Sequence, residues 1–188
     1  MTSTELFELQ LRKGREGEDA FRIMANKHFD VVTDYTNYDM WKDIQSKGID
    51  FGFKMNHWPN EITCDVKTNL YYQNDYYHTG YVFNIEYEKW CTERFNKHNR
   101  ELEEGWIQDS KANRIYHFEK GTMNYLYYDL DEMRSFIFRE WDRPNGWLQK
   151  FGNSYIGTVN SDYARIIPVS INDERFKDLI RKIDIEGI

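Results

Sequence analysis

Residues 48–69 read GIDFGFKMNHWPNEITCDVKTN, and their alternation of apolar and polar side chains constrains the fold more than any other stretch. Two runs with a period of two residues flank the loop MNHWPN, so they predict a β-hairpin with one buried face. If Lys54 pairs with Glu61, the same register sets Asp50 opposite Asp65. A slip of one residue would put Ile and Phe side chains beside the carboxylates, so the pattern favours this register.

The register divides the hairpin into an apolar face and a charged face. The residues expected on the apolar face are Ile49, Phe51, Phe53, Ile62, Cys64 and Val66. The other face carries Asp50, Asp65 and Lys67, with Gly48 opposite Lys67 and leaving space beside it. Directly opposed side chains have Cβ atoms about 5 Å apart, at which distance two carboxylates repel each other. A divalent cation such as Mg²⁺ would offset that repulsion, because it takes carboxylate and phosphate oxygens as ligands.

A solvated hairpin face is the alternative interpretation of these charges. The pattern Asp-x-Lys occurs twice, at Asp65–Lys67 and at Asp109–Lys111, so the tripeptide alone is a weak signal. The second copy lies in a turn that leads into a helix and lacks an alternating apolar face. We therefore expect the metal site at the hairpin only.

The rest of the chain predicts a mixed α/β (α+β) fold, with a central mixed β-sheet flanked by helices. Helices are expected over about 15–28, 38–46, 105–114 and 129–141, and in a closing amphipathic segment from about 172. Further strands are expected over 29–35, 80–88, 115–121, 124–130, 154–159 and 163–171. We expect a single domain over residues 1–188, with a C-terminal extension from about residue 142.

Composition excludes several classes of protein. The net charge of −7 argues against a protein that coats nucleic acid without sequence preference. It does not exclude a nucleic-acid enzyme, because acids that hold a metal increase the negative charge while basic residues can still line a groove. Cys64 and Cys91 form no CxxC pattern, which argues against a zinc or disulfide framework. The chain has no apolar run of the roughly 20 residues that a membrane span needs and no signal-peptide pattern at its start, so a cytoplasmic protein is expected.

The order of these features resembles the PD-(D/E)XK nuclease superfamily, which has a restriction-endonuclease-like core. Its motif matches Asp50, then Asp65-Val66-Lys67, and an acid of the first helix, Glu18 in GREGEDAF. The segment DIQSKGIDF is similar to a sequence that precedes the first acid in phage and resolvase-like branches, and it marks Gln45. The resemblance spans about residues 14–140. Ile49 stands where the family's name pattern has proline.

The resemblance implies a metal-dependent nuclease of DNA, an endonuclease of phage type, with Mg²⁺ or Mn²⁺ as its cofactor. Asp50 and Asp65 would hold the metal with the Val66 carbonyl, and Lys67 would position or activate the attacking water. Glu18 would hold a second metal or orient Lys67; otherwise it is a surface acid of its helix. RNA is an alternative substrate, a homodimer is expected as in many proteins of this fold, and a phage-encoded chain would act in the host cytoplasm.

Weaker candidates surround this set. Gln45 either contacts the site or caps a turn, and Glu86 either binds metal or meets solvent. For nucleic-acid contact we select the cations Arg12, Lys13 and Arg15 and the aromatic side chains Tyr71 and Tyr72, whose rings could equally pack in the core. Two other functions remain open: a noncatalytic nucleic-acid-binding or regulatory protein that retains the nuclease fold, and a phage accessory or structural protein.

Overall fold

The computed structural model describes residues 3–74, 79–90, 103–142, 155–159 and 162–181. Its helices are α1 (Ser3–His28), α2 (Tyr38–Gln45), α3 (Trp106–Asp109) and α4 (Leu130–Asp142). Its strands are β1 (Val31–Asp34), β2 (Phe51–Lys54), β3 (Ile62–Asn74), β4 (Thr79–Trp90), β5 (Glu103–Glu104), β6 (Arg114–Glu119), β7 (Tyr125–Asp129), β8 (Tyr155–Val159) and β9 (Asp162–Ser170). The predicted mixed α/β class is confirmed, with helices flanking a large sheet.

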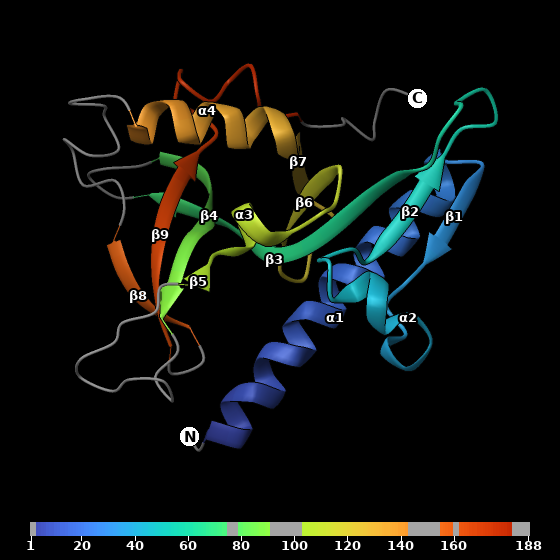
Figure 1. Ribbon diagram of the computed structural model, residues 1–188, viewed down its shortest axis with the longest axis horizontal. Helices are drawn as coiled ribbons and strands as arrows, with labels where there is room; N and C mark the ends of the chain where they lie inside the picture. Colours follow the sequence, from blue (N-terminus) through green and yellow to red (C-terminus); the bar gives the residue numbers. More distant parts are fainter. Residues whose placement is uncertain (1–2, 75–78, 91–102, 143–154, 160–161, 182–188) are drawn as a thin grey trace.

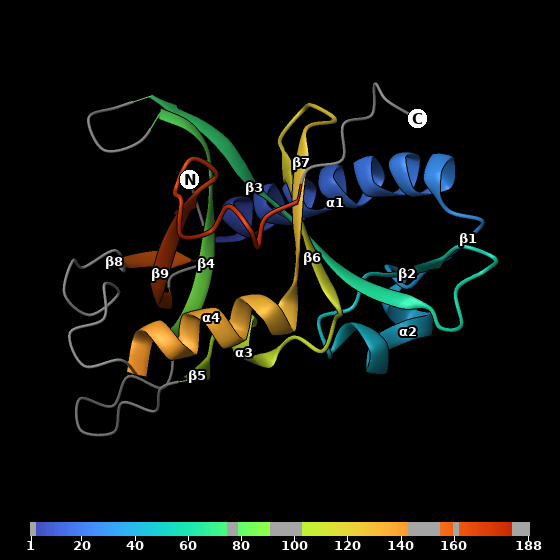
Figure 2. The same ribbon diagram turned by 90° about the horizontal axis from the view of Figure 1, so that it is seen from above.

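Strand β3 is the axis of the sheet. It pairs antiparallel with β2 at its start, parallel with β6 in its middle and antiparallel with β4 at its end. The order along the main path is β1-β2-β3-β4-β9-β8, with β6 and β7 branching from β3 and β5 lying on β4. Figures 1 and 2 show α1 and α4 on opposite sides of β3 and β6. A side chain on β3 therefore lies where both halves of the sheet meet.

Helix α1 covers the hairpin with an aromatic core. Phe21 and Met24 are fully buried, as their helical spacing predicts, and the helix starts earlier than expected, at Ser3. The Phe21 ring lies 4.7 Å from that of Phe51 and 4.9 Å from that of Tyr116. These ring contacts hold α1 against both β2 and β6.

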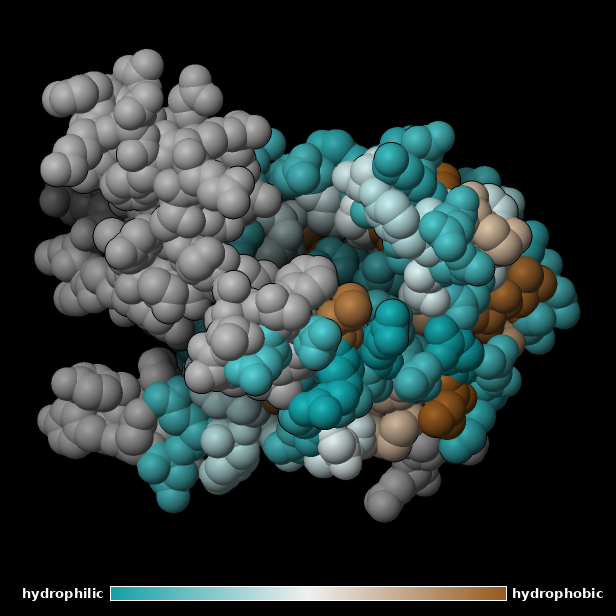
Figure 3. Space-filling view, turned by 90° about the horizontal axis from the view of Figure 1, so that it is seen from below, coloured by the Kyte–Doolittle hydropathy of each residue, from teal (hydrophilic) through white to brown (hydrophobic). Residues whose placement is uncertain are grey.

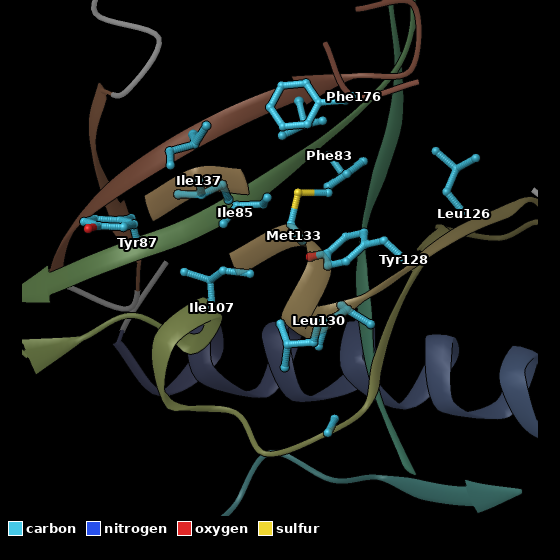
Figure 4. Close-up of a cluster of buried hydrophobic side chains, with 14 of the residues drawn as sticks. Phe83, Ile85, Tyr87, Ile107, Leu126, Tyr128, Leu130, Met133, Ile137 and Phe176 are labelled. Atoms are coloured by element: carbon cyan, nitrogen blue, oxygen red, sulfur yellow. The ribbon is translucent and has the colours of Figure 1, made fainter. Parts of the chain in front are cut away.

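Helix α4 covers the other half of the sheet. Helical spacing predicts that Leu130, Met133, Ile137 and Trp141 share one stripe of this helix. Leu130, Met133 and Ile137 are fully buried in one cluster with Phe83 and Ile85 of β4, and Figure 4 shows Met133 and Ile137 beside these two side chains. Phe176 joins the same cluster from the C-terminal segment. The side chain of Trp141, also expected on this stripe, lies outside the described side chains.

The helix expected from about residue 172 is wrong for the described part of that segment. Residues 171–180 form successive turns, in which the Ile180 N–H donates to the Phe176 carbonyl at 3.0 Å. The backbones of Arg181 and Tyr127 then exchange hydrogen bonds of 2.7 and 2.9 Å at the edge of β7. An amphipathic pattern alone does not distinguish a helix from turns that bury one ring and end on a strand edge.

Among the described residues, the face shown in Figure 3 is mainly polar, and the hydrophobic side chains are scattered in small groups. None of the described helices is long and apolar enough to span a membrane.

Gly17 sets how closely α1 approaches β3. A Cβ atom at Gly17 would lie 2.5 Å from Thr68 Oγ1, and the Thr68 hydroxyl donates to the Lys13 carbonyl at 2.7 Å. This bond fixes Lys13 beside the strand segment that carries Lys67. Gly14, one turn earlier, has no atom within 4 Å of a Cβ in the same position.

We expect Gly17→Ala to lower the free energy of unfolding by about 1–3 kcal/mol, because the added methyl forces α1 away from Thr68. Gly14→Ala is the matched control and should raise it by about 0.5–1 kcal/mol through helix propensity alone. Urea denaturation of both variants measures the two changes. Equal stabilisation by both substitutions would contradict the close approach at Gly17.

Candidate functional site

The predicted hairpin register is confirmed over β2. Phe53 pairs with Ile62, Gly52 with Thr63 and Phe51 with Cys64. Each of these pairs follows from the alternation of apolar and polar residues.

The ladder ends before Asp50, which is a correction to the predicted facing pair. The Asp50 N–H donates to the Cys64 carbonyl at 2.9 Å, so Asp50 lies beside β3 and is not in register with Asp65. The cause is the chain just before it. Gly48 has a φ of +67°, and Ser110 Oγ donates to its carbonyl at 3.1 Å. Ser110 also fills the space that was expected to stay open toward Lys67.

The same departure moves Ile49 off the predicted apolar face. Phe51, Phe53, Cys64 and Val66 pack in the cluster under α1, as expected. Ile49 packs instead in the cluster under α4. A strict period of two therefore holds from Phe51 onward only.

Asp50 and Asp65 still lie close enough for the charge of one to affect the pKa of the other. Asp65 is 2% exposed, and the Val66 N–H donates to Asp50 Oδ2 at 2.8 Å. Burial raises the pKa of Asp50 well above its usual value and the charge of Asp65 raises it further, while Lys67 and the Val66 N–H act in the opposite direction. Two carboxylates are thus held close together at one end of β2 with limited access to water.

Lys67 compensates part of this negative charge. Its ammonium nitrogen lies 2.8 Å from Asp65 Oδ2, and its side chain is 29% exposed. Burial alone would lower the pKa of Lys67, but Asp65 and Asp50 outweigh that effect and raise it. Lys67 is therefore a cation at neutral pH, which supplies positive charge and hydrogen-bond donors but no base.

A cavity of about 550 Å³ opens beside Lys67. Its lining includes Lys13 from α1, Val66 and Lys67 from β3, Glu86 from β4 and Trp106 from α3. Two lysines and one tryptophan thus border a space of the size that small ligands occupy.

The donor set fits an open Mg²⁺ or Mn²⁺ site in which the protein supplies few ligands. Among the described residues, no group of three or more His, Cys, Asp or Glu side chains is placed to hold a metal ion. However, Asp65 is a buried carboxylate whose Oδ2 is paired with the Lys67 ammonium at 2.8 Å, and Asp50 supplies a second carboxylate close to it. Mg²⁺ is commonly held by one or two carboxylates, with phosphate oxygens and water completing its shell. Asp50 and Asp65 meet that requirement, and the Val66 carbonyl stays a proposed third ligand.

The other candidate residues, Glu18, Glu86 and Gln45, differ in how they contact this site. Glu18 is on α1 and its charge raises the pKa of Asp50, so the two acids lie near each other. Burial raises the pKa of Glu18 itself, while Arg22 lowers it. Glu86 lines the cavity and its charge raises the pKa of Lys67. Gln45 ends α2, where its carbonyl accepts the Gly48 N–H at 2.9 Å, so it supports the approach to β2 through its backbone.

The residues selected for nucleic-acid contact fall into two places. Arg12 and Arg15 are exposed on α1, and Lys13 borders the cavity. Tyr71 and Tyr72 are 38% and 57% exposed on the far part of β3, where Tyr72 contacts the Tyr81 ring edge-on at 5.5 Å. Lys13 thus lines the same cavity as Lys67, Arg12 and Arg15 are exposed on the same helix as Lys13, and the tyrosine rings are accessible further along β3.

Sequence reasoning missed the polar groups that β6 brings to Lys67. His117 pairs with Lys67 in the parallel ladder, and its ring bonds Asn69 Oδ1 at 2.5 Å and the Tyr128 hydroxyl at 3.2 Å. Burial and the charge of Lys67 lower the pKa of His117 well below its usual value, so the ring is neutral. The sequence feature that could have indicated His117 is its position as a histidine within the otherwise mainly apolar run IYHFE.

We expect Asp50→Asn to stabilise the metal-free protein by about 1 kcal/mol or more at pH 8, because it removes a buried charge beside Asp65 and keeps an oxygen for the Val66 N–H. An acid whose folded-state pKa is raised destabilises the fold above its unfolded pKa of about 4. The gain should therefore grow as pH rises above about 4 and disappear below it. Thermal unfolding in EDTA across this range measures it; a gain that persists at pH 3 would contradict the electrostatic cause.

No comparison with known proteins assigns this chain to a family. No protein-family model matches the sequence, and no curated protein matches it. The structure is similar to that of a bacterial homing endonuclease, I-Ssp6803I, with a TM-score of 0.46 and 13% sequence identity over 87% of this chain and 79% of that chain. We therefore base the functional argument on Asp50, Asp65 and Lys67.

Proposed function

We propose that the chain is a Mg²⁺- or Mn²⁺-dependent nuclease that hydrolyses phosphodiester bonds of DNA. One observation supports the proposal above all: the buried carboxylate of Asp65 and the partly buried carboxylate of Asp50 lie close together beside the cationic Lys67, which lines a cavity. The resemblance of these residues to the PD-(D/E)XK motif agrees with the same chemistry.

The carboxylates would hold the metal and Lys67 would face the substrate. A bound divalent cation would stabilise charge on the phosphate and lower the pKa of an attacking water. Asp65 holds the Lys67 ammonium at 2.8 Å, which keeps a flexible side chain near the carboxylates. Because Lys67 is protonated, its role is to neutralise developing charge on phosphate oxygens and to orient water by donating hydrogen bonds.

Substrate binding would use the groups around the cavity. Lys13 borders the cavity, and the exposed Arg12 and Arg15 extend positive charge along α1. The exposed rings of Tyr71 and Tyr72 offer faces on which unpaired bases can stack.

A noncatalytic nucleic-acid-binding protein is the second candidate. It is favoured by the lack, among the described residues, of a ready group of three metal-ligating side chains. Calorimetric titration with Mg²⁺ and Mn²⁺ separates the two functions, since binding that is lost in Asp65→Asn supports the enzyme. If neither Mg²⁺ nor Mn²⁺ binds, whether DNA is present or not, the second candidate is favoured.

We expect Lys67→Met and Asp65→Asn each to lower the rate of Mg²⁺-dependent DNA cleavage by about 100-fold or more, because each removes charge from the site of phosphoryl transfer. The matched controls are Lys111→Met and Asp109→Asn, which alter the second Asp-x-Lys copy at exposed positions. Labelled single-stranded, duplex and branched DNA and RNA, with and without EDTA, measure cleavage and substrate preference. Full activity in either hairpin variant would refute the site.

A further inference from the structure

We propose that Trp106 is a positioning residue that holds the Lys67 ammonium at the wall of the cavity. The inference rests on the proposed function, since Lys67 needs a fixed position only if it acts on a substrate. Lys67 Nζ lies 5.5 Å from the centre of the Trp106 ring, and both residues line the cavity. A cation within about 6 Å of an indole ring is attracted by its electron-rich face.

A second anchor is needed because the ion pair with Asp65 alone does not define where the ammonium lies. A lysine has a flexible stem of four carbons, and its ammonium can rotate among acceptors. Asp65 is buried and is not among the residues that line the cavity, whereas Trp106 lines it. The two contacts together place the charge between the carboxylate and the open space.

The backbone around Trp106 is held by contacts from two elements, β4 and α4. A Cβ atom at Gly105 would lie 2.3 Å from the Glu86 carbonyl oxygen, and the Gly105 N–H donates to the Tyr87 carbonyl at 2.9 Å. Arg134 of α4 donates to the Ile107 carbonyl at 2.6 Å and also reaches the carbonyl of Ser110. Such close fixation of a helix of four residues fits a ring whose position matters.

His117 completes the surroundings of the ammonium without competing for it. Its ring lies 5.9 Å from the Trp106 ring and stacks on Phe83 at 4.2 Å. Asn69 and Tyr128 take up its two nitrogens. The ring is neutral, so it does not repel Lys67.

A purely structural role is the alternative, because Trp106 is half-buried and packs against the cluster under α4. A structural role predicts lost stability, whereas a positioning role predicts a changed environment of Lys67 in protein that remains folded. Two readouts separate them: the proton chemical shifts of the Lys67 ε-methylene group and the division of kinetic effects between kcat and KM.

In the full-length wild-type chain, the ring current of Trp106 should move the ε-methylene signal of Lys67 upfield, with Lys67→Arg assigning the signal. In Trp106→Leu the shift should return toward the value of an exposed lysine, and Trp106→Phe should keep part of it. We expect Trp106→Leu to lower kcat for DNA cleavage about tenfold, with little change in KM, and Trp106→Phe to restore most of the rate. Trp41→Leu is the matched control, because Trp41 packs on Tyr35 at 5.2 Å and is not among the residues that line the cavity.

Arg134→Gln tests the same idea without changing the ring. This substitution loosens the turn of α3. As a single substitution, it should reduce both kcat and the upfield shift of the Lys67 ε-methylene signal. Combined with Trp106→Leu, it should lower kcat no further than Trp106→Leu alone does. If Trp106→Leu does not fold, Trp106→Phe and Arg134→Gln decide the question. An unchanged Lys67 shift, or an unchanged kcat in folded Trp106→Leu, would overturn the inference. If the wild-type protein cleaves no nucleic acid with Mg²⁺ or Mn²⁺, the proposed function fails, while the chemical shift of the Lys67 ε-methylene group still reports on the contact with Trp106.

Discussion

The ion pair of Asp65 and Lys67 lies on the one strand that pairs with β2, β4 and β6. A buried charge is costly unless it is compensated, so everything around this pair must limit that cost. The compensation is incomplete, because Asp50 adds a second carboxylate and burial and Asp65 raise its pKa. The structure thus retains excess negative charge in a place where hydrophobic residues would be more stable.

That arrangement is tolerated because the two sides of β3 are tightly packed. On one side α1 brings Phe21 onto the hairpin, and on the other α4 brings Met133 and Ile137 onto β4. Aromatic packing of this extent contributes several kcal/mol for each buried ring, enough to offset one unfavourable charge. Packing away from the site therefore offsets the unfavourable charge interactions at Asp50 and Asp65. Such unfavourable charges are common where a protein binds a cation or an anion.

The hairpin could be predicted from the sequence because a slip of one residue would place Asp65 opposite Ile49 or Phe51, on the apolar face. The helix stripe of Met133 and Ile137 followed from spacing in the same way. The position of Asp50 could not be predicted, since it depends on Ser110, which is 62 residues from Gly48 and fills its turn. Strand alternation contains no information about such a contact.

The neighbours of Lys67 show the same limit more clearly. His117 is 50 residues from Lys67 along the chain and reaches it only through the parallel pairing of β3 with β6. Trp106 reaches it because Arg134 and Tyr87 hold the short turn of α3. A local pattern can indicate which residues carry charge, but the surroundings that determine the protonation and position of that charge come from tertiary contacts. For Lys67 those surroundings favour the protonated form, so of the two roles considered for it, orienting water by hydrogen-bond donation is favoured over accepting its proton.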